Sequence, residues 1–322
     1  MTQAPLLDVR DLSVALLSST GNLPIVEDLS FEIGPGEFFA LVGESGSGKS
    51  VSCLALMGLL ASHLQARGHA ALCGRALVGD GAHPRRARSG AAMIFQHATQ
   101  SLNPVRSIGF QLMETLRTIR REARSTAKSS AIALLAEVGL ANPERLLAAY
   151  PHQLSGGMNQ RVMIALALAV EPTLLIADEP TSSLDVTMQA QVLDLLDRLR
   201  RDRGMAVLFV THDLAVAAER ADRIGVLYAG RLVELGDTQD VFSKPLHRYT
   251  AGLLASMPRF GAAETRLPAL AGSVPLPGAW PSGCGFAPRC VAATDSCRAV
   301  HPAFRGEPSH RYACHHPARQ LA

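Results

Sequence analysis

The sequence predicts an α/β protein with an open, mostly parallel sheet. A glycine-rich phosphate-binding pattern lies between an apolar run and a helical pattern near residue 43, and short apolar runs alternate with helical patterns through much of the chain. Such alternation is typical of parallel sheets covered by helices. The 322 residues include 48% hydrophobic and 18% charged residues, which suits a well-packed protein of this class. No run approaches the ~20 apolar residues that cross a bilayer, and a net charge of +3 is too small to indicate nucleic acid as a partner.

Residues 43–50 match the complete pattern G-x-x-x-x-G-K-[ST]. The apolar run 38–42 before it predicts a buried strand, and the residues after it, to about 60, predict a helix. Glycines in this position allow backbone N–H groups to surround an anion at the positive end of the helix. Lys49 is expected to reach the β- and γ-phosphates, and the Ser50 hydroxyl to hold the bridging Mg²⁺. The predicted nucleoside triphosphate site is therefore Gly43, Glu44, Ser45, Gly46, Ser47, Gly48, Lys49 and Ser50.

The other elements follow from local patterns. Two strands are expected before the one that leads into the phosphate loop, and a Gly/Ala/Arg-rich stretch after the loop's helix is expected to be irregular, with short strands, to about residue 90. The expected strands are 7–16, 25–33, 38–42, 91–96, 174–177 and 206–210, and the expected helices are 48–60, segments within 108–150, and 186–201. Beyond about Pro258 the chain becomes rich in Pro, Gly, Cys and His and loses periodicity, which predicts a domain boundary there.

Five further motifs follow the phosphate loop in a fixed order. They are Phe95-Gln96 at a strand end, LSGGMNQR at 154–161 at the start of an apolar helix, the strand Leu174–Glu179 ending in two carboxylates, a loop with Asp185, and a strand ending in Thr211-His212. Their order and content resemble the nucleotide-binding subunits of ABC transporters over roughly residues 7–256. LSGGMNQR is the most specific part of the resemblance, because ordinary phosphate-loop ATPases lack it.

This resemblance implies a fold and a set of catalytic roles. The fold would be a P-loop ABC ATPase domain at residues 1–257, with a mostly parallel core sheet, an antiparallel β subdomain and a helical signature subdomain at about 100–170. Asp178 would bind Mg²⁺ or its water, and Glu179 would be the general base for the attacking water. His212 would contact the γ-phosphate, and Gln96 would touch both Mg²⁺ and the water.

The signature residues are implied to act on a second subunit. Ser155 and the amides of Gly156 and Gly157 cap a helix N-terminus, which attracts the γ-phosphate of ATP held by the opposite subunit. The implied group acting in trans is Leu154, Ser155, Gly156, Gly157 and Asp185. Hydrolysis would then depend on closure of a head-to-tail pair. Leu16 stands where relatives place an aromatic residue that stacks on adenine, so both ATP and GTP stay open as the nucleotide.

Other stretches resemble the peptide and nickel branch of ABC importers. Ser101-Leu102-Asn103-Pro104 and the block 247–254, HRYTAGLL, carry this likeness, and the tail is similar to that of dipeptide and oligopeptide importer ATPases. The implied function is ATP hydrolysis that drives import of dipeptides or oligopeptides. Import of nickel, opines or glutathione-like solutes is an alternative. A soluble ABC ATPase acting on nucleic acid or ribosomes is a distant one.

Four cysteines lie within the predicted extension, residues 258–322, at Cys284, Cys290, Cys297 and Cys314. A disulfide framework is unfavourable in a reducing cytosol. The spacing C-x5-C-x6-C-x16-C fits poorly with a zinc ribbon, whose cysteines pair at closer intervals. Four thiolates from a proline-rich loop suit an iron–sulfur cluster, and the importer resemblance also suggests [4Fe–4S]. Zinc and no metal stay open as alternatives, and the nearby histidines are not assigned as ligands.

The resemblance also implies partners and a location. The partners would be a homologous ATPase subunit, most simply in a heterodimer, two transmembrane permease subunits and, indirectly, an extracytoplasmic solute-binding protein. No nucleic acid is expected as a partner. The first residues have neither a basic nor an apolar signal region, so we expect a peripheral protein on the cytoplasmic face of the inner or plasma membrane.

Overall fold

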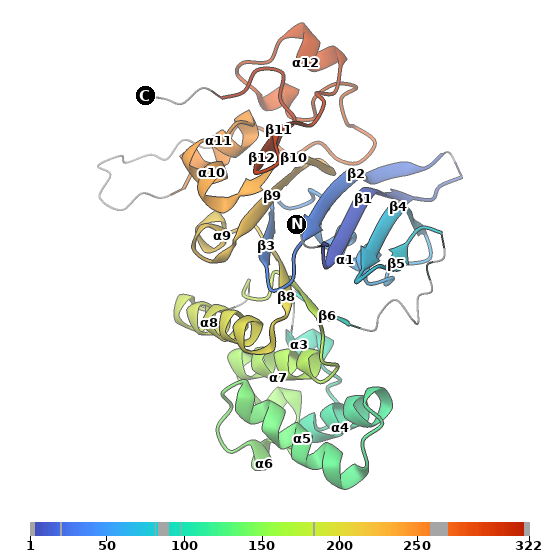
Figure 1. Cartoon of the computed structure of the whole chain (residues 1–322), viewed down its shortest axis with the longest axis vertical. Helices are drawn as coiled ribbons and strands as arrows, with labels where there is room; N and C mark the ends of the chain where they lie inside the picture. Colours follow the sequence, from blue (N-terminus) through green and yellow to red (C-terminus); the bar gives the residue numbers. More distant parts are fainter. Residues whose placement is uncertain are drawn as a thin grey trace. The chain divides into compact units, whose positions relative to one another are not determined.

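The structure is a computed structural model of the chain (Figure 1). It describes residues 4–19, 21–80, 82, 90–96, 98–182, 184–257 and 270–318, so the first part of the predicted extension, 258–269, lies outside the described residues. The chain divides into two compact units. The first combines residues 1–83 with 209–322, and the second comprises residues 84–208. The predicted boundary near residue 257 stays a prediction.

The first unit contains an antiparallel sheet in the order β2-β1-β4-β5. Its strands are β1 (Leu7–Leu16), β2 (Leu23–Ile33), β4 (Leu64–Leu72) and β5 (Arg75–Val78). The central strand β1 pairs antiparallel with β2 and β4. The stretch after the first helix is predicted to be irregular with short strands; β5 is such a short strand, whereas β4 is longer than expected and pairs with β1 from Leu64 to Leu72.

The main sheet of the first unit has the order β11-β12-β10-β9-β3-β8. Its longer strands are β3 (Phe38–Val42), β8 (Ala206–Thr211), β9 (Arg223–Tyr228) and β10 (Arg231–Asp237), and β8 continues into the second unit. Strand β3 is buried at all five residues and pairs parallel with β9. Burial on both faces explains why β3 is an uninterrupted apolar run rather than an alternating one.

Within the described residues, these strands are accompanied by the helices α1 (Lys49–Leu56), α9 (Leu214–Arg220), α10 (Thr238–Ser243) and α11 (Arg248–Ala255). Helix α1 ends four residues earlier than the predicted end near residue 60. Met57 caps it, and Gly58 follows with a φ of 59°. A left-handed glycine after the last turn is a common way for a helix to end.

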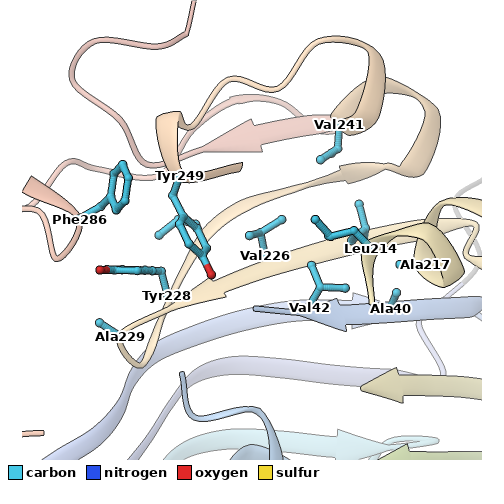
Figure 2. Close-up of a cluster of buried hydrophobic side chains, with 12 residues drawn as sticks. Ala40, Val42, Leu214, Ala217, Val226, Tyr228, Ala229, Val241, Tyr249 and Phe286 are labelled. Atoms are coloured by element: carbon cyan, nitrogen blue, oxygen red, sulfur yellow. The ribbon is translucent and has the colours of Figure 1, made fainter. Parts of the chain in front are cut away.

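The described C-terminal segment, residues 270–318, packs into the first unit. It contains a short 3₁₀ helix η2 (Ala287–Arg289), helix α12 (Asp295–Ala299), and strands β11 (Arg305–Glu307) and β12 (His310–Tyr312). Strand β12 pairs antiparallel with β10, an element that the sequence does not predict here. Phe286 is 3% exposed, and its ring centroid lies 5.4 Å from that of Tyr228 and 5.5 Å from that of Tyr249 (Figure 2). The segment therefore contributes to the core of this unit.

The second unit carries the predicted helical region. Strands β6 (Ala91–Ile94) and β7 (Leu174–Asp178) pair parallel, and β7 is followed in the sheet by β8. The helices are α3 (Ala98–Ser101), α4 (Ile108–Ile119), α5 (Arg124–Glu137), α6 (Pro143–Leu146), η1 (Pro151–Gln153), α7 (Gly156–Leu168) and α8 (Val186–Arg203). Among the described helices, none combines the length and apolar character needed to cross a membrane.

Candidate nucleotide site and cysteine-lined cavity

The phosphate loop joins the buried strand β3 to helix α1. Gly48 is the N-cap of α1, with a φ of 103°, and Lys49 begins the helix. The Lys49 side chain lies within the loop, since its Nζ donates to the carbonyl oxygens of Gly43 at 2.7 Å and Glu44 at 2.9 Å. Ser45 and Gly46, in contrast, are exposed. The ammonium group and the N-terminal amides of α1 thus face the same short loop, which is the arrangement that binds phosphate.

Two glycines of the loop are required by their surroundings. A Cβ atom at Gly43 would lie 2.2 Å from the carbonyl oxygen of Leu227, which is far inside van der Waals contact. A Cβ atom at Gly48 would lie 2.9 Å from Val26, and its φ favours glycine as well. The loop therefore keeps its curve by packing against β2 and the end of β9.

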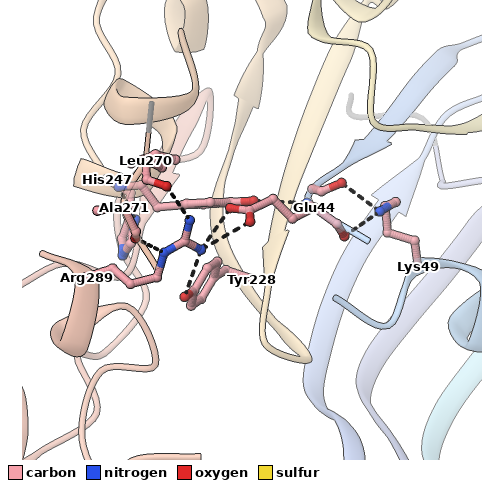
Figure 3. A network of polar contacts seen from close by, with 9 residues as sticks. Glu44, Lys49, Tyr228, His247, Leu270, Ala271 and Arg289 are labelled. Atoms are coloured by element: carbon pink, nitrogen blue, oxygen red, sulfur yellow. Dashed lines mark hydrogen bonds and ion pairs between the residues drawn. The ribbon is translucent and has the colours of Figure 1, made fainter. Parts of the chain in front are cut away.

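Glu44 connects the phosphate loop to the C-terminal segment (Figure 3). Arg289 donates to both of its carboxylate oxygens, at 3.0 and 3.2 Å, and the Glu44 amide donates to the Tyr249 hydroxyl at 3.0 Å. These partners are 245 and 205 residues away along the chain. Sequence reasoning missed both partners, because no local pattern relates positions so far apart.

His212 lies where the sequence predicts it, directly after β8, and it is exposed. The next residue, Asp213, caps α9 by accepting hydrogen bonds from the amides of Ala215 at 2.9 Å and Val216 at 3.2 Å. The cap fixes the backbone just after the histidine. Leu16 is the last residue of β1 and is half-buried.

The second unit brings the predicted glutamine and general base together. Gln96 Nε2 donates to Glu179 Oε2 at 2.9 Å. They meet because β6 and β7 are parallel neighbours, with Ile94 opposite Ala177, and each residue follows its strand closely. Asp178 ends β7 and is 6% exposed. Glu179 has a φ of 45°, a left-handed conformation that non-glycine residues rarely adopt outside functional sites and turns.

The signature residues also lie as predicted, at the start of α7. Ser155 is the N-cap, its hydroxyl accepts from the Met158 amide at 3.3 Å, and Ser155 and Gly156 are exposed. Gly157 is buried against Met188, where a Cβ atom would lie 2.1 Å from the methyl carbon. Leu154 is half-buried before the cap. The helix therefore presents an open N-terminus that favours an anion.

Asp185 is the N-cap of α8, and its carboxylate accepts from the Met188 amide at 2.9 Å. Asp185 itself is exposed, as are the next two residues. Met188 thus links this cap to the signature helix, because its amide donates to Asp185 and its side chain packs on Gly157. The predicted trans-acting residues therefore lie at the N-termini of two helices that Met188 connects.

Comparison with known proteins identifies the family. The ABC transporter family model matches residues 26–182, and the model for the oligopeptide/dipeptide transporter C-terminal region matches residues 233–297. The dipeptide transport ATP-binding protein DppD of Haemophilus influenzae is 44% identical, with 98% of this chain and 96% of the relative covered. DppD of Escherichia coli K12 is 46% identical, with 97% of each covered. The chain belongs to the ABC transporter ATP-binding subunits of the dipeptide and oligopeptide family.

Solved structures confirm the fold of this ABC subunit. CbiO1 of Clostridium perfringens, part of the ABC transporter complex cbiONQ, superposes with a TM-score of 0.64 over 74% of this chain and 91% of its own, at 24% identity. The ATP-binding cassette MJ0796, a dimer in a post-hydrolysis state with ADP and Pi, superposes with a TM-score of 0.63. The superposition covers 72% of this chain and 98% of MJ0796, at 26% identity. The predicted ABC ATPase fold and ATPase activity are confirmed. The roles of individual residues stay predictions.

The four tail cysteines of the ABC subunit line one cavity, together with His247 and Phe286. Burial, reinforced by the other three thiols, raises the pKa of Cys284 to about 11. At Cys297 burial also opposes ionisation, but hydrogen bonds from Thr294 and Ser296 outweigh it and lower the pKa. Within the described ranges, no three or more His, Cys, Asp or Glu side chains are arranged to hold a single metal ion.

Proposed function

We propose that this ATP-hydrolysing ABC subunit powers the import of dipeptides or oligopeptides. The observation that carries the proposal is the match of residues 233–297 to the oligopeptide/dipeptide transporter C-terminal region. The nearly full-length likeness to two DppD proteins supports it. A probable D,D-dipeptide transport ATP-binding protein of Escherichia coli K12, DdpD, is 43% identical over 100% of this chain, which also favours a short peptide as the solute.

The residues proposed to act on the ATP bound to this same chain bind its phosphates and Mg²⁺ and activate the attacking water. Lys49 would bind the β- and γ-phosphates, and Ser50 and Asp178 would hold the Mg²⁺ ion directly or through water. Glu179 would take the proton of the attacking water, with its carboxylate oriented by the hydrogen bond from Gln96. His212 would contact the γ-phosphate. The hydrogen bond between Gln96 and Glu179 supports the assignment of the base, because general bases in enzymes are commonly held by such a partner.

The other half of the proposed ATP site consists of the signature residues, which would act on ATP bound to a second subunit. The open N-terminus of α7, at Ser155 and Gly156, would face the γ-phosphate of ATP bound to a homologous subunit, in a head-to-tail heterodimer. Closure of the pair would complete the site and couple hydrolysis to motion of two transmembrane permease subunits. The subunit would lie on the cytoplasmic face of the membrane, and an extracytoplasmic binding protein would deliver the peptide.

We also propose that the cysteine-lined cavity holds a [4Fe–4S] cluster. Cys284, Cys290, Cys297 and Cys314 would each supply one thiolate, and the cluster would act as a structural cross-link of the C-terminal segment. The chemistry of the donor set supports this proposal, because four cysteine side chains line one cavity. Hydrogen bonds to the sulfur atoms, such as that between Thr294 Oγ1 and Cys297 Sγ at 3.4 Å, are typical of cluster sites.

Uptake of a labelled tripeptide by native cells carrying Lys49→Ala at the chromosomal locus tests the transport function. We expect uptake to fall to background, because the buried ammonium group is the main cationic contact of the phosphate loop. Lys128→Ala, which removes an exposed lysine of α5, is the matched control and should leave uptake unchanged. Nickel uptake is measured in the same strains. Normal peptide uptake, or a defect confined to nickel uptake, would overturn the peptide assignment.

A further inference from the structure

The ion pair between Arg289 and Glu44 joins the C-terminal segment to the phosphate loop (Figure 3). The Arg289 side chain is only 6% exposed, and its Nη1 lies 3.0 Å from Glu44 Oε1 and 3.2 Å from Oε2. The same nitrogen lies 3.3 Å from the Tyr228 hydroxyl. A buried guanidinium with a carboxylate partner is a directional contact, in contrast to a mobile surface ion pair.

Arg289 is held firmly on its own side of the contact. Its Nε donates to the Ala271 carbonyl oxygen at 2.8 Å, and its Nη2 to that of Leu270 at 3.4 Å. Its guanidinium carbon also lies 5.7 Å from the ring centroid of Tyr228 and 5.9 Å from that of Phe286. The position of the guanidinium group is therefore set by the fold of the C-terminal segment.

Glu44 transmits this position to the phosphate loop. Its amide donates to the buried Tyr249 hydroxyl, and its carbonyl oxygen accepts from Lys49 Nζ at 2.9 Å. Glu44 is thus fixed through its side chain and its backbone, one residue after Gly43. Without Arg289, the negative charge of the partly exposed Glu44 carboxylate would be uncompensated beside the phosphate loop. This charge would then repel the phosphates that the loop must bind.

We infer that Arg289 is a positioning residue for ATP, which holds Glu44 and neutralises its charge so that the phosphate loop binds the triphosphate tightly. The C-terminal segment then belongs to the machinery of the nucleotide site. This role goes beyond the proposed function, since it requires neither a peptide solute nor an occupied cysteine cavity. It would hold for any nucleoside triphosphate whose phosphates bind this loop.

A double-mutant cycle on the purified full-length chain tests the inference. ATP affinity is measured by equilibrium dialysis for the native protein, Arg289→Ala, Glu44→Gln and the double variant, and kcat and KM are measured in parallel on each variant assembled with its homologous subunit. We expect Arg289→Ala to weaken ATP binding about tenfold, a value moderated because water screens the partly exposed Glu44 carboxylate. The loss should appear in KM more than in kcat. Adding Glu44→Gln should restore the affinity to within about twofold, because it removes the uncompensated charge.

Two further variants separate positioning from loss of fold. Arg311→Ala removes an exposed arginine that stacks on Phe304 in the same segment, and it should leave ATP affinity unchanged. Arg289→Lys keeps the charge without the forked contacts and should give an intermediate affinity. Native ATP affinity in Arg289→Ala would overturn the inference. Failure of Glu44→Gln to restore binding in a protein with a native thermal transition would overturn it as well.

Discussion

At the scale of single residues, Glu179 is the most informative position in the second unit. It combines a carboxylate at the end of a buried strand with a φ of 45° and a hydrogen bond from Gln96. A left-handed backbone at a non-glycine residue costs on the order of 1–3 kcal/mol, so the surrounding structure must impose it. Its place between β7 and the following turn explains how the side chain meets a residue that follows the neighbouring strand β6.

Glu179→Gln should therefore leave ATP bound but slow its hydrolysis. The amide cannot accept the proton of the attacking water, and we expect kcat to fall at least about a hundredfold with nucleotide affinity retained. Glu171→Gln is a matched control, because Glu171 is an exposed glutamate of the same unit with a similar φ of 50°. Steady-state ATPase assays and ATP binding measurements check both variants. Near-normal turnover of Glu179→Gln would exclude this residue as the general base.

At the scale of elements, the sequence predicts best those strands and helices whose own residues form a clear apolar pattern. β3 is a continuous apolar run before the glycine loop, and its predicted bounds are those observed. β4 lies in a stretch expected to be irregular with short strands, and its nine residues form one continuous strand mainly through antiparallel pairing with β1. β12 is missed for a similar reason, since its three residues gain strand structure only by pairing with β10. Long-range pairing, which no local window contains, decides both strands.

The C-terminal segment offers a test of this tertiary contribution. Phe286→Ala should lower the free energy of unfolding by about 3–5 kcal/mol, because the ring packs between Tyr228 and Tyr249 in the core of the first unit and leaves a cavity when removed. Val291→Ala, at a fully exposed position of the same segment, should change it by less than about 0.5 kcal/mol. Urea denaturation of the two variants measures the difference. Equal stabilities would mean that the segment does not share the core.

At the scale of the whole molecule, the residues assigned to ATP hydrolysis are distributed over both units. The phosphate loop and His212 belong to the first, whereas Gln96, Asp178, Glu179 and the signature residues belong to the second. The motifs could be recognised from the sequence, because each is a short pattern at the end of a strand or the start of a helix. Arg289 and Tyr249 could not be recognised from the sequence, because their role depends on contacts with Glu44 that only the folded chain creates.

The cysteine-lined cavity yields the last prediction for the whole molecule. Protein purified without oxygen should be brown and contain about four irons and as many acid-labile sulfides per chain, because four cysteine side chains line the cavity and could each supply one ligand. Cys290→Ser should lose most of this iron, since the oxygen ligand replaces a thiolate at one corner of the cluster. Cys73→Ser is the control, because Cys73 is an exposed cysteine between β4 and β5, outside the C-terminal segment. Colourless protein with one zinc, or with no metal, would contradict the cluster and leave the four thiols a packing role within the C-terminal segment.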